Sequence, residues 1–269
     1  MVIFLLTSFF LFLLGAAVGS FINLVIYRST RNANWVWGNS KCDHCGKKLA
    51  WYDNIPLLSY LILRGRSRCC HKKLSIAHPA MELLMGSLFV WWYFMGAIFF
   101  KLTTQPLVVL QPVFWLLVGI ILLGILMADW LYYIIPDTLV LSLLGLALIY
   151  RLYLTWAGIM QPRDLQLTLL ATAGLTIFFA LLFFLTRGQG FGFGDVKFAL
   201  PMGLILGWPK LMVGVFLSFI FGSLVGLILL GLKKKKFGQV IPFGPFLVLG
   251  TFCGLLWGGE VWRWYLGML

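Results

Sequence analysis

Acidic residues are scarce in this chain of 269 residues, which contains eight Asp and Glu against 21 Lys and Arg. Charged residues of both signs make up only 11% of the sequence, whereas about 25% is usual in soluble globular domains. Such a composition excludes an ordinary soluble domain. Because 61% of the residues are hydrophobic, the sequence predicts a protein that crosses a membrane several times.

Basic residues are absent ahead of the first apolar run, which is followed by Arg28 and Arg31. A cleaved signal peptide is therefore not expected, and residues 1–27 are interpreted as a membrane anchor with its N-terminus outside. Runs of about 20 apolar residues, enough to cross the hydrocarbon core, recur along the chain. We expect an all-α polytopic membrane protein with about eight transmembrane helices, the sixth unusually short. The runs begin near Val2, Ala80, Pro112, Thr138, Leu167, Phe198, Leu211 and Phe243.

The positive charges follow the predicted topology. Alternation from an outside N-terminus places four segments on the cytoplasmic side: 28–79, 129–137, 187–197 and 232–242. Together they contain 16 of the 21 Lys and Arg residues, in agreement with the positive-inside rule. The net charge of +13 is thus explained by topology, and no nucleic-acid partner is expected. Membrane lipids, anionic ones near Lys233–Lys236 included, are the expected surroundings.

Residues 28–79 form a polar insert between the anchor and a predicted transmembrane core at 80–269. The insert contains four of the five cysteines. Cys42 and Cys45 have the spacing at which both thiolates reach one tetrahedral zinc ion, and a second pair of cysteines follows at a typical distance. The insert is therefore predicted to be a small cytoplasmic zinc-binding segment.

The second pair, Cys69 and Cys70, departs from this pattern because adjacent cysteines point in different directions. Ser67 stands where a two-residue spacing from Cys70 would require a thiol. Cys70 is a predicted ligand together with the first pair, and the fourth ligand is Cys69, His71 or His44. The alternative is four reduced cytoplasmic thiols without a metal, since disulfides are disfavoured in that compartment.

Two aspartates stand at the ends of long apolar runs, where a charge is costly to place. The helix count puts both Asp129 and Asp195 on the cytoplasmic face. Asp129 lies at the C-terminal end of its predicted helix, an unfavourable place for a carboxylate. Asp137, in contrast, follows Pro136 just ahead of a new apolar run and is explained as a helix N-cap with a supporting role.

Asp195 belongs to the segment GFGFGDVK at 190–197, in which Gly190, Gly192 and Gly194 alternate with other residues. Glycine lets the backbone approach a neighbouring chain closely, as a scissile peptide would require. A dinucleotide-binding loop is excluded because a membrane segment offers no strand–turn–helix context. We interpret Gly192, Gly194 and Lys197 as residues that support the aspartate.

Two carboxyl groups on one face predict aspartyl hydrolysis, in which one acts as general base on water and the other as general acid. Close carboxyls share a proton because both cannot easily ionise together. The helix dipoles favour Asp195 as the base and Asp129 as the group that holds the proton.

The chain resembles the type IV prepilin peptidases, bifunctional leader peptidases and N-methyltransferases with a GxGD motif. Six segments carry the resemblance in the family's order: GSFINLVIYR (19–28), CDHCGKKLAWYDNIPLLSYLILRGR (42–66), HPAMELL (78–84), ADWLYYIIPD (128–137), GFGDVK (192–197) and IPFGPFLVLG (241–250).

The resemblance implies that Asp129 and Asp195 form the catalytic pair. It further implies cleavage of the basic leader of prepilins or pseudopilins at the cytoplasmic face of a bacterial inner membrane. Methylation of the new N-terminus from S-adenosylmethionine is implied by the resemblance alone. A non-enzymatic membrane scaffold of a pilus or secretion apparatus remains as the alternative. A transporter with the aspartates as a proton relay is disfavoured, because neither acid is predicted near the middle of the membrane.

Overall fold

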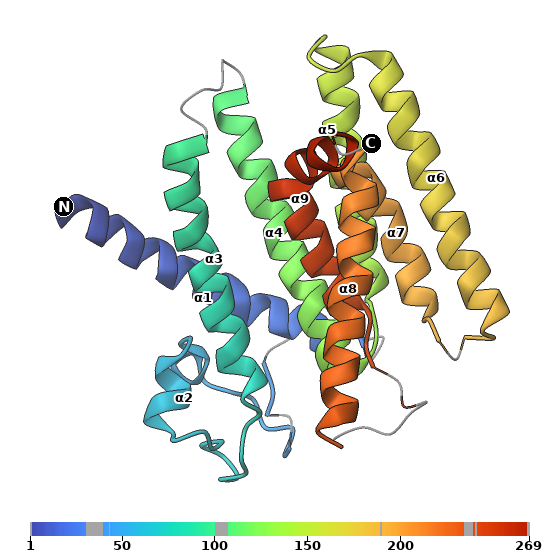
Figure 1. The fold of residues 1–269 in the computed structure, drawn as a ribbon. Coiled ribbons are helices and arrows are strands. Elements are labelled where there is room, and N and C mark those ends of the chain that lie inside the picture. The colour runs from blue at the N-terminus through green and yellow to red at the C-terminus, as the bar shows by residue number, and fades with distance from the viewer. Residues whose placement is uncertain are drawn as a thin grey trace. The chain divides into compact units, whose positions relative to one another are not determined.

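A computed structural model describes residues 2–30, 40–42, 44–99, 107–188, 190–233, 239 and 241–267. These residues form helices, with no strand beyond two isolated bridges, so the expected all-α class is confirmed. The elements, shown in Figure 1, are α1 (Val2–Ser29), η1 (Trp51–Asn54), α2 (Leu58–Ile62), α3 (Ala77–Phe99), α4 (Leu107–Tyr132), α5 (Asp137–Trp156), α6 (Pro162–Leu185), α7 (Phe193–Leu206), α8 (Lys210–Gly231) and α9 (Gly244–Leu266).

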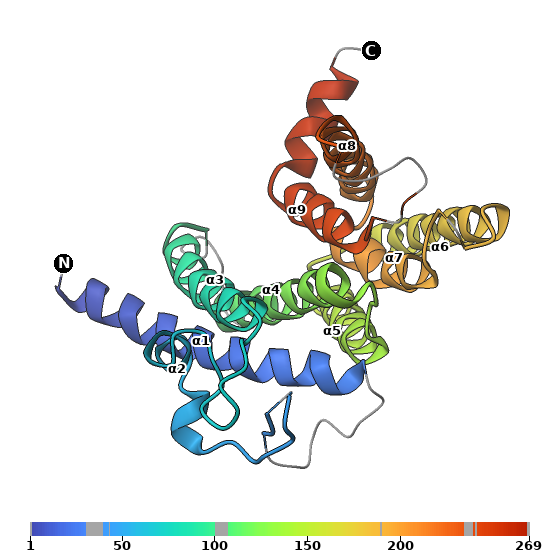
Figure 2. The ribbon, with the colours of Figure 1, turned by 90° about the horizontal axis from the view of Figure 1, so that it is seen from below.

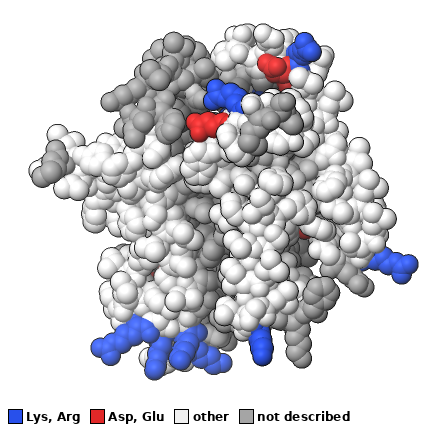
Figure 3. Space-filling view, in the orientation of Figure 1, with Lys and Arg blue, Asp and Glu red and all other residues white. Residues whose placement is uncertain are grey.

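Eight long helices begin within a few residues of the expected positions. Within the described residues, six of them are long and apolar enough to cross a membrane: α1, α4, α5, α6, α8 and α9. The expected short sixth helix is α7, with 14 residues. The visible face in Figure 3 is mostly free of charged side chains, as a surface that contacts lipid requires. Of the predicted lipid-contacting lysines, Lys234–Lys236 lie outside the described residues.

The chain divides into two compact units, Met1–Gly124 and Ile125–Leu269. In the first unit, α1 packs closely on α3 (Figures 1 and 2). A Cβ atom at Gly15 would lie 2.7 Å from the carbonyl oxygen of Met85, and one at Gly86 would lie 2.7 Å from the Phe12 ring. Small residues therefore let the two backbones approach, as is common between membrane helices.

Glu82 links the insert to α3. Helix α3 begins at Ala77 rather than near the expected Ala80, so Glu82 lies in its second turn and not in its first. The buried carboxylate accepts the backbone N–H of Leu57 at 2.8 Å. Leu57 has a positive φ of 60°, which is unusual for a residue other than glycine. This hydrogen bond therefore stabilises a strained turn of the insert.

In the second unit, α7 lies beside α6 and also contacts α5, α8 and α9 (Figures 1 and 2). Its C-terminus is capped by Arg151 of α5. The guanidinium donates from Nε to the carbonyl oxygen of Leu204 at 2.7 Å and from Nη2 to that of Ile205 at 3.0 Å. Because the last carbonyls of a helix have no partner within it, this cap lets the short α7 end inside the unit.

Helices α8 and α9 depend on glycine at their contact. A Cβ atom at Gly250 would lie under 3.0 Å from both the Ser218 hydroxyl and the Gly214 carbonyl oxygen. We expect Gly250→Ala to lower the thermal unfolding midpoint in detergent, because the two backbones must separate. Gly145→Ala in α5 is the control, since no atom lies within 4 Å of a Cβ there. Equal midpoints for the two variants would contradict this packing.

Candidate functional site

Asp129 lies three residues before the end of α4 and is 6% exposed. Its Oδ2 atom accepts the backbone N–H of Gly244, the first residue of α9, at 2.8 Å. A Cβ atom at residue 244 would lie 2.6 Å from that oxygen, so the contact requires glycine. Asp129 therefore faces the N-terminus of α9, where free N–H groups and the positive end of the helix dipole favour a carboxylate.

This partner corrects the expectation that Asp129 has only an unfavourable helix end beside it. The C-terminus of α4 and the N-terminus of α9 act on the same carboxylate with opposite sign. The helix dipoles therefore do not distinguish Asp195 as the base from Asp129 as the group that holds the proton.

Asp195 is the third residue of α7 and is 5% exposed. It lies inside the first turn of the helix, and its Oδ2 atom accepts the N–H of Gly192 at 3.0 Å. A Cβ atom at Gly194 would lie 3.1 Å from the Ile135 side chain, in the link between α4 and α5. The glycine-rich segment therefore packs against the segment that follows Asp129.

Both aspartates thus lie where the C-terminus of α4 meets the N-termini of α7 and α9. Helices α7 and α9 contact each other, so the two carboxylates lie at neighbouring helix N-termini. Each carboxylate has one oxygen held by a backbone N–H, and the described residues provide no further hydrogen bond to either. Two interacting carboxyl groups that are largely removed from water do not readily ionise together.

Asp137 corrects the predicted N-cap. Pro136 occupies the cap position, and Asp137 is the first residue of α5, with no cap hydrogen bond from a side chain. Its carboxylate instead pairs with Lys197 Nζ at 2.5 Å, and the two side chains are 63% and 34% exposed. Ion pairs at a surface contribute about 0–1 kcal/mol, so the pair is a modest tie between α5 and α7 beside Asp195.

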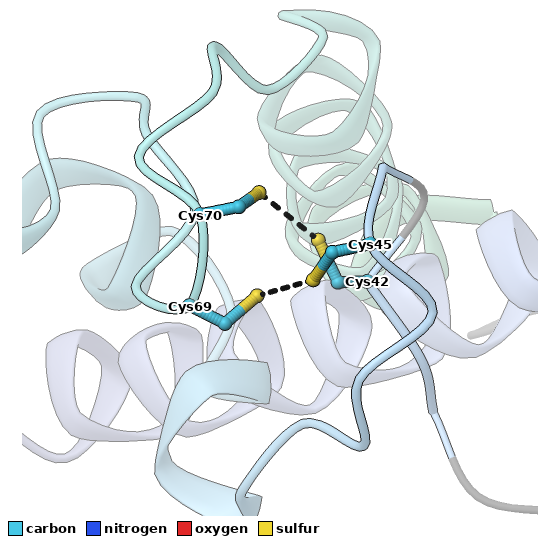
Figure 4. Close-up of side chains that lie close together, drawn as sticks. All are labelled: Cys42, Cys45, Cys69 and Cys70. Carbon is cyan, nitrogen blue, oxygen red and sulfur yellow. Dashed lines mark hydrogen bonds between the residues drawn. The ribbon is translucent and has the colours of Figure 1, made fainter.

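The four cysteines of the insert form one cluster. The sulfur atoms of Cys42, Cys45, Cys69 and Cys70 all lie within 4.8 Å of one another, and the side chains point toward a common centre (Figure 4). Sulfurs around a tetrahedral zinc ion are about 3.8 Å apart. The cluster could hold a metal ion. Among the described residues it contains no histidine, and His44 Nε2 contacts the carbonyl oxygen of Lys73 at 3.1 Å instead.

Two loops of similar backbone structure present these cysteines. In the first, the Cys42 N–H donates to the Lys47 carbonyl, and the Gly46 N–H donates to the Cys42 carbonyl. In the second, Ser67 bonds to Lys72 and His71 in the same way. Isolated bridges close both loops, between Lys41 and Lys48 and between Arg66 and Lys73.

Ser67 therefore occupies the position that Cys42 has in the first loop, and Cys70 that of Cys45. The thiol missing at Ser67 is supplied two residues later by Cys69, whose sulfur lies 3.0 Å from that of Cys45. The buried Ser67 hydroxyl lies 3.2 Å from the Cys42 sulfur and 3.1 Å from the Cys69 sulfur. It can donate to only one thiolate of the cluster at a time.

The cysteine thiols of the cluster do not all ionise easily together. Burial would raise the pKa of Cys42, but hydrogen bonds from Ser67 and from the backbone of Cys45 and His44 lower it to about 6. The contact with Cys69 raises the pKa of Cys45 to about 12. A cation that binds all four sulfurs must therefore displace protons, so its affinity is expected to fall as the pH falls.

Two known families match successive parts of the chain. Residues 13–95 match the Bacterial Peptidase A24 N-terminal domain, and residues 115–227 match the Type IV leader peptidase family. A "Prepilin leader peptidase/N-methyltransferase" of Pseudomonas putida is 31% identical and aligns with 93% of this chain and 90% of its own length. The chain belongs to the type IV leader peptidase family. Its match to the type IV leader peptidase family includes both Asp129 and Asp195.

A relative of the same name from Pseudomonas aeruginosa is 32% identical over 94% of this chain and 91% of its own length. Another, from Pectobacterium carotovorum, is 32% identical over 91% of each chain. No solved structure matches the chain. The family resemblance that rests on the six sequence segments is thus confirmed.

Gly244 was not predicted as a site residue, although it lies in the segment IPFGPFLVLG that contributes to the resemblance. Its role depends on a hydrogen bond between residues 115 positions apart in the sequence. The available signal was a Gly-Pro pair at the start of an apolar run, which marks a helix start without showing what that start faces.

Proposed function

We propose that the protein is a membrane aspartic endopeptidase that removes the leader peptide of type IV prepilins or pseudopilins, with Asp129 and Asp195 as its catalytic pair. The observation that carries this proposal is the pair itself: two buried carboxylates, each oriented by one backbone N–H at a helix N-terminus, on two helices that contact each other. A non-enzymatic scaffold gives no reason to bury two interacting acids in one place.

The proposed chemistry uses one proton shared by the two carboxyl groups. The ionised carboxylate takes a proton from water, whose oxygen attacks the scissile carbonyl carbon, while the protonated partner donates to the carbonyl oxygen. Collapse of the tetrahedral intermediate breaks the C–N bond and returns a proton to the leaving amine. With Oδ2 of each aspartate held by Gly192 or Gly244, the Oδ1 atoms are left to bind the proton and the water.

The catalytic face is proposed to be cytoplasmic. The distribution of Lys and Arg supports this side for the C-terminus of α4 and the N-terminus of α7. An apolar helical substrate can then lie in the bilayer against the enzyme, with membrane lipids around both. Its basic leader stays in the cytoplasm while the scissile bond reaches the aspartates.

Zinc is the proposed metal for the four-cysteine cluster, since a tetrahedral set of thiolates suits a structural zinc site. Cys42, Cys45, Cys69 and Cys70 would hold it and so fix the two loops of the insert. S-adenosylmethionine is the proposed methyl donor because the relatives are named N-methyltransferases. No residue of this chain is assigned to that step.

Mass spectrometry of the N-terminus of a coexpressed prepilin tests cleavage and methylation together. We expect a pilin that starts immediately after its leader and carries one added methyl group. An intact leader in the presence of folded, membrane-inserted enzyme would contradict the peptidase proposal. A trimmed but unmethylated N-terminus would contradict only the methyltransferase part.

A further inference from the structure

Four phenylalanine rings in the second unit are all in mutual contact. They are Phe179 of α6, Phe191 of the glycine-rich segment, Phe219 of α8 and Phe243 just before α9. The six distances between their ring centroids range from 5.2 to 6.4 Å. We call these residues the phenylalanine tetrad. Each of its rings comes from a different segment of the chain.

Two members of the tetrad stand next to the backbone donors of the site. Phe191 precedes Gly192, whose N–H donates to Asp195, and Phe243 precedes Gly244, whose N–H donates to Asp129. The Phe191 and Phe243 rings contact each other directly, at 5.2 Å and an interplanar angle of 84°. This edge-to-face arrangement is favourable for aromatic pairs.

The two donor segments need an external restraint. Glycine residues impose little conformational preference, and Gly190, Gly192 and Gly194 lie within one short segment. At the start of α9, Gly244 can have no side chain because Asp129 Oδ2 fills that space. The adjacent rings of Phe191 and Phe243 are side chains through which both segments can be fixed to each other. Phe179 is completely buried and anchors the tetrad to α6.

We propose that the phenylalanine tetrad is a positioning device, which holds both donor segments in the single arrangement that aligns Asp129 with Asp195. The inference rests on the proposed aspartyl protease function. Phe219 is its central test position, because it lies on α8, outside both donor segments, and contacts the three other rings. Its ring contacts Phe191 and Phe243, the residues next to the two backbone donors.

The test compares cleavage of a prepilin-like peptide by reconstituted wild type, Phe219→Ala and Phe216→Ala. Phe216 is the matched control, a phenylalanine on the same helix that is 65% exposed. We expect Phe219→Ala to lower kcat about 10- to 100-fold with little change in KM, because misplaced catalytic groups slow the chemical step rather than binding. The pH–rate profile should change shape, since it reports the coupling of the two carboxyls.

A purely structural role predicts a different result. Loss of packing alone would lower the yield or the unfolding midpoint, while the folded fraction would keep the wild-type kcat and pH–rate profile. That outcome would overturn the inference. Phe219→Leu, which retains apolar bulk without the ring, supplies the same comparison if Phe219→Ala does not fold. Failure of wild type and Phe216→Ala to cleave would instead contradict the proposed function.

Discussion

Asp129→Asn and Asp195→Asn are each expected to lower kcat for leader cleavage at least about 1,000-fold, with little effect on the amount of folded protein. Asparagine preserves an oxygen that can accept the Gly244 or Gly192 N–H, so the local hydrogen bonds survive. What disappears is the shared proton, because an amide neither accepts a proton from water nor donates one as an acid does. A lower kcat in these variants therefore reflects a slower chemical step and not a loss of folded protein.

The double variant gives a sharper result than either single variant. Groups that act as one unit are strongly non-additive, so Asp129→Asn/Asp195→Asn should be no slower than the worse single variant. Single-turnover cleavage of a prepilin-like peptide in detergent or liposomes measures all three. Asp164→Asn is the control, an exposed acid in the first turn of α6, at the opposite end of that helix from the glycine-rich segment. Near-normal cleavage by either single variant would mean that the aspartyl mechanism is wrong.

The sequence predicted the helices well because membrane spans are encoded by simple runs of apolar residues. Even the short α7 was predicted, since Gly207, Trp208 and Pro209 interrupt the run between it and α8. The exact helix starts were less predictable. Asp137 was predicted to be an N-cap from the assumed start of its helix, and the structure gives it a different partner, Lys197.

The candidate site was predictable in its residues but not in its contacts. Asp129 and Asp195 stood out as acids beside apolar runs, whereas nothing near them in the sequence indicates Gly244 or the phenylalanine tetrad. Those contacts join segments that are distant in the sequence. In a membrane protein with many phenylalanines, the sequence does not indicate which rings contact one another. The fourth member of the cysteine cluster stayed open for the same reason, because neighbouring side chains such as Cys69 and Cys70 are distinguished only by the fold of their loop.

Replacing Cys69 tests the metal site and the equivalence of its two loops. We expect Cys69→Ser to reduce bound zinc under reducing conditions from about one equivalent to less than half, since a structural site needs four ligands. Adding Ser67→Cys to that variant should restore about one equivalent, because residue 67 has the backbone position of Cys42 and a sulfur there recreates the regular two-residue spacing. Cys253→Ser in α9, outside the insert, should leave the zinc content unchanged.

Metal analysis of the purified proteins, with thiol reactivity as a second measurement, separates the possible outcomes. A full equivalent of zinc in Cys69→Ser would assign the fourth ligand to another residue, His44 or His71. Failure of the double variant to regain zinc would refute the loop equivalence while leaving Cys69 a ligand. Less than half an equivalent in wild type itself would favour four reduced thiols. Because the thiols must lose their protons in order to bind zinc, the zinc content of wild type should also fall on acidification. In the double variant it should fall in the same way.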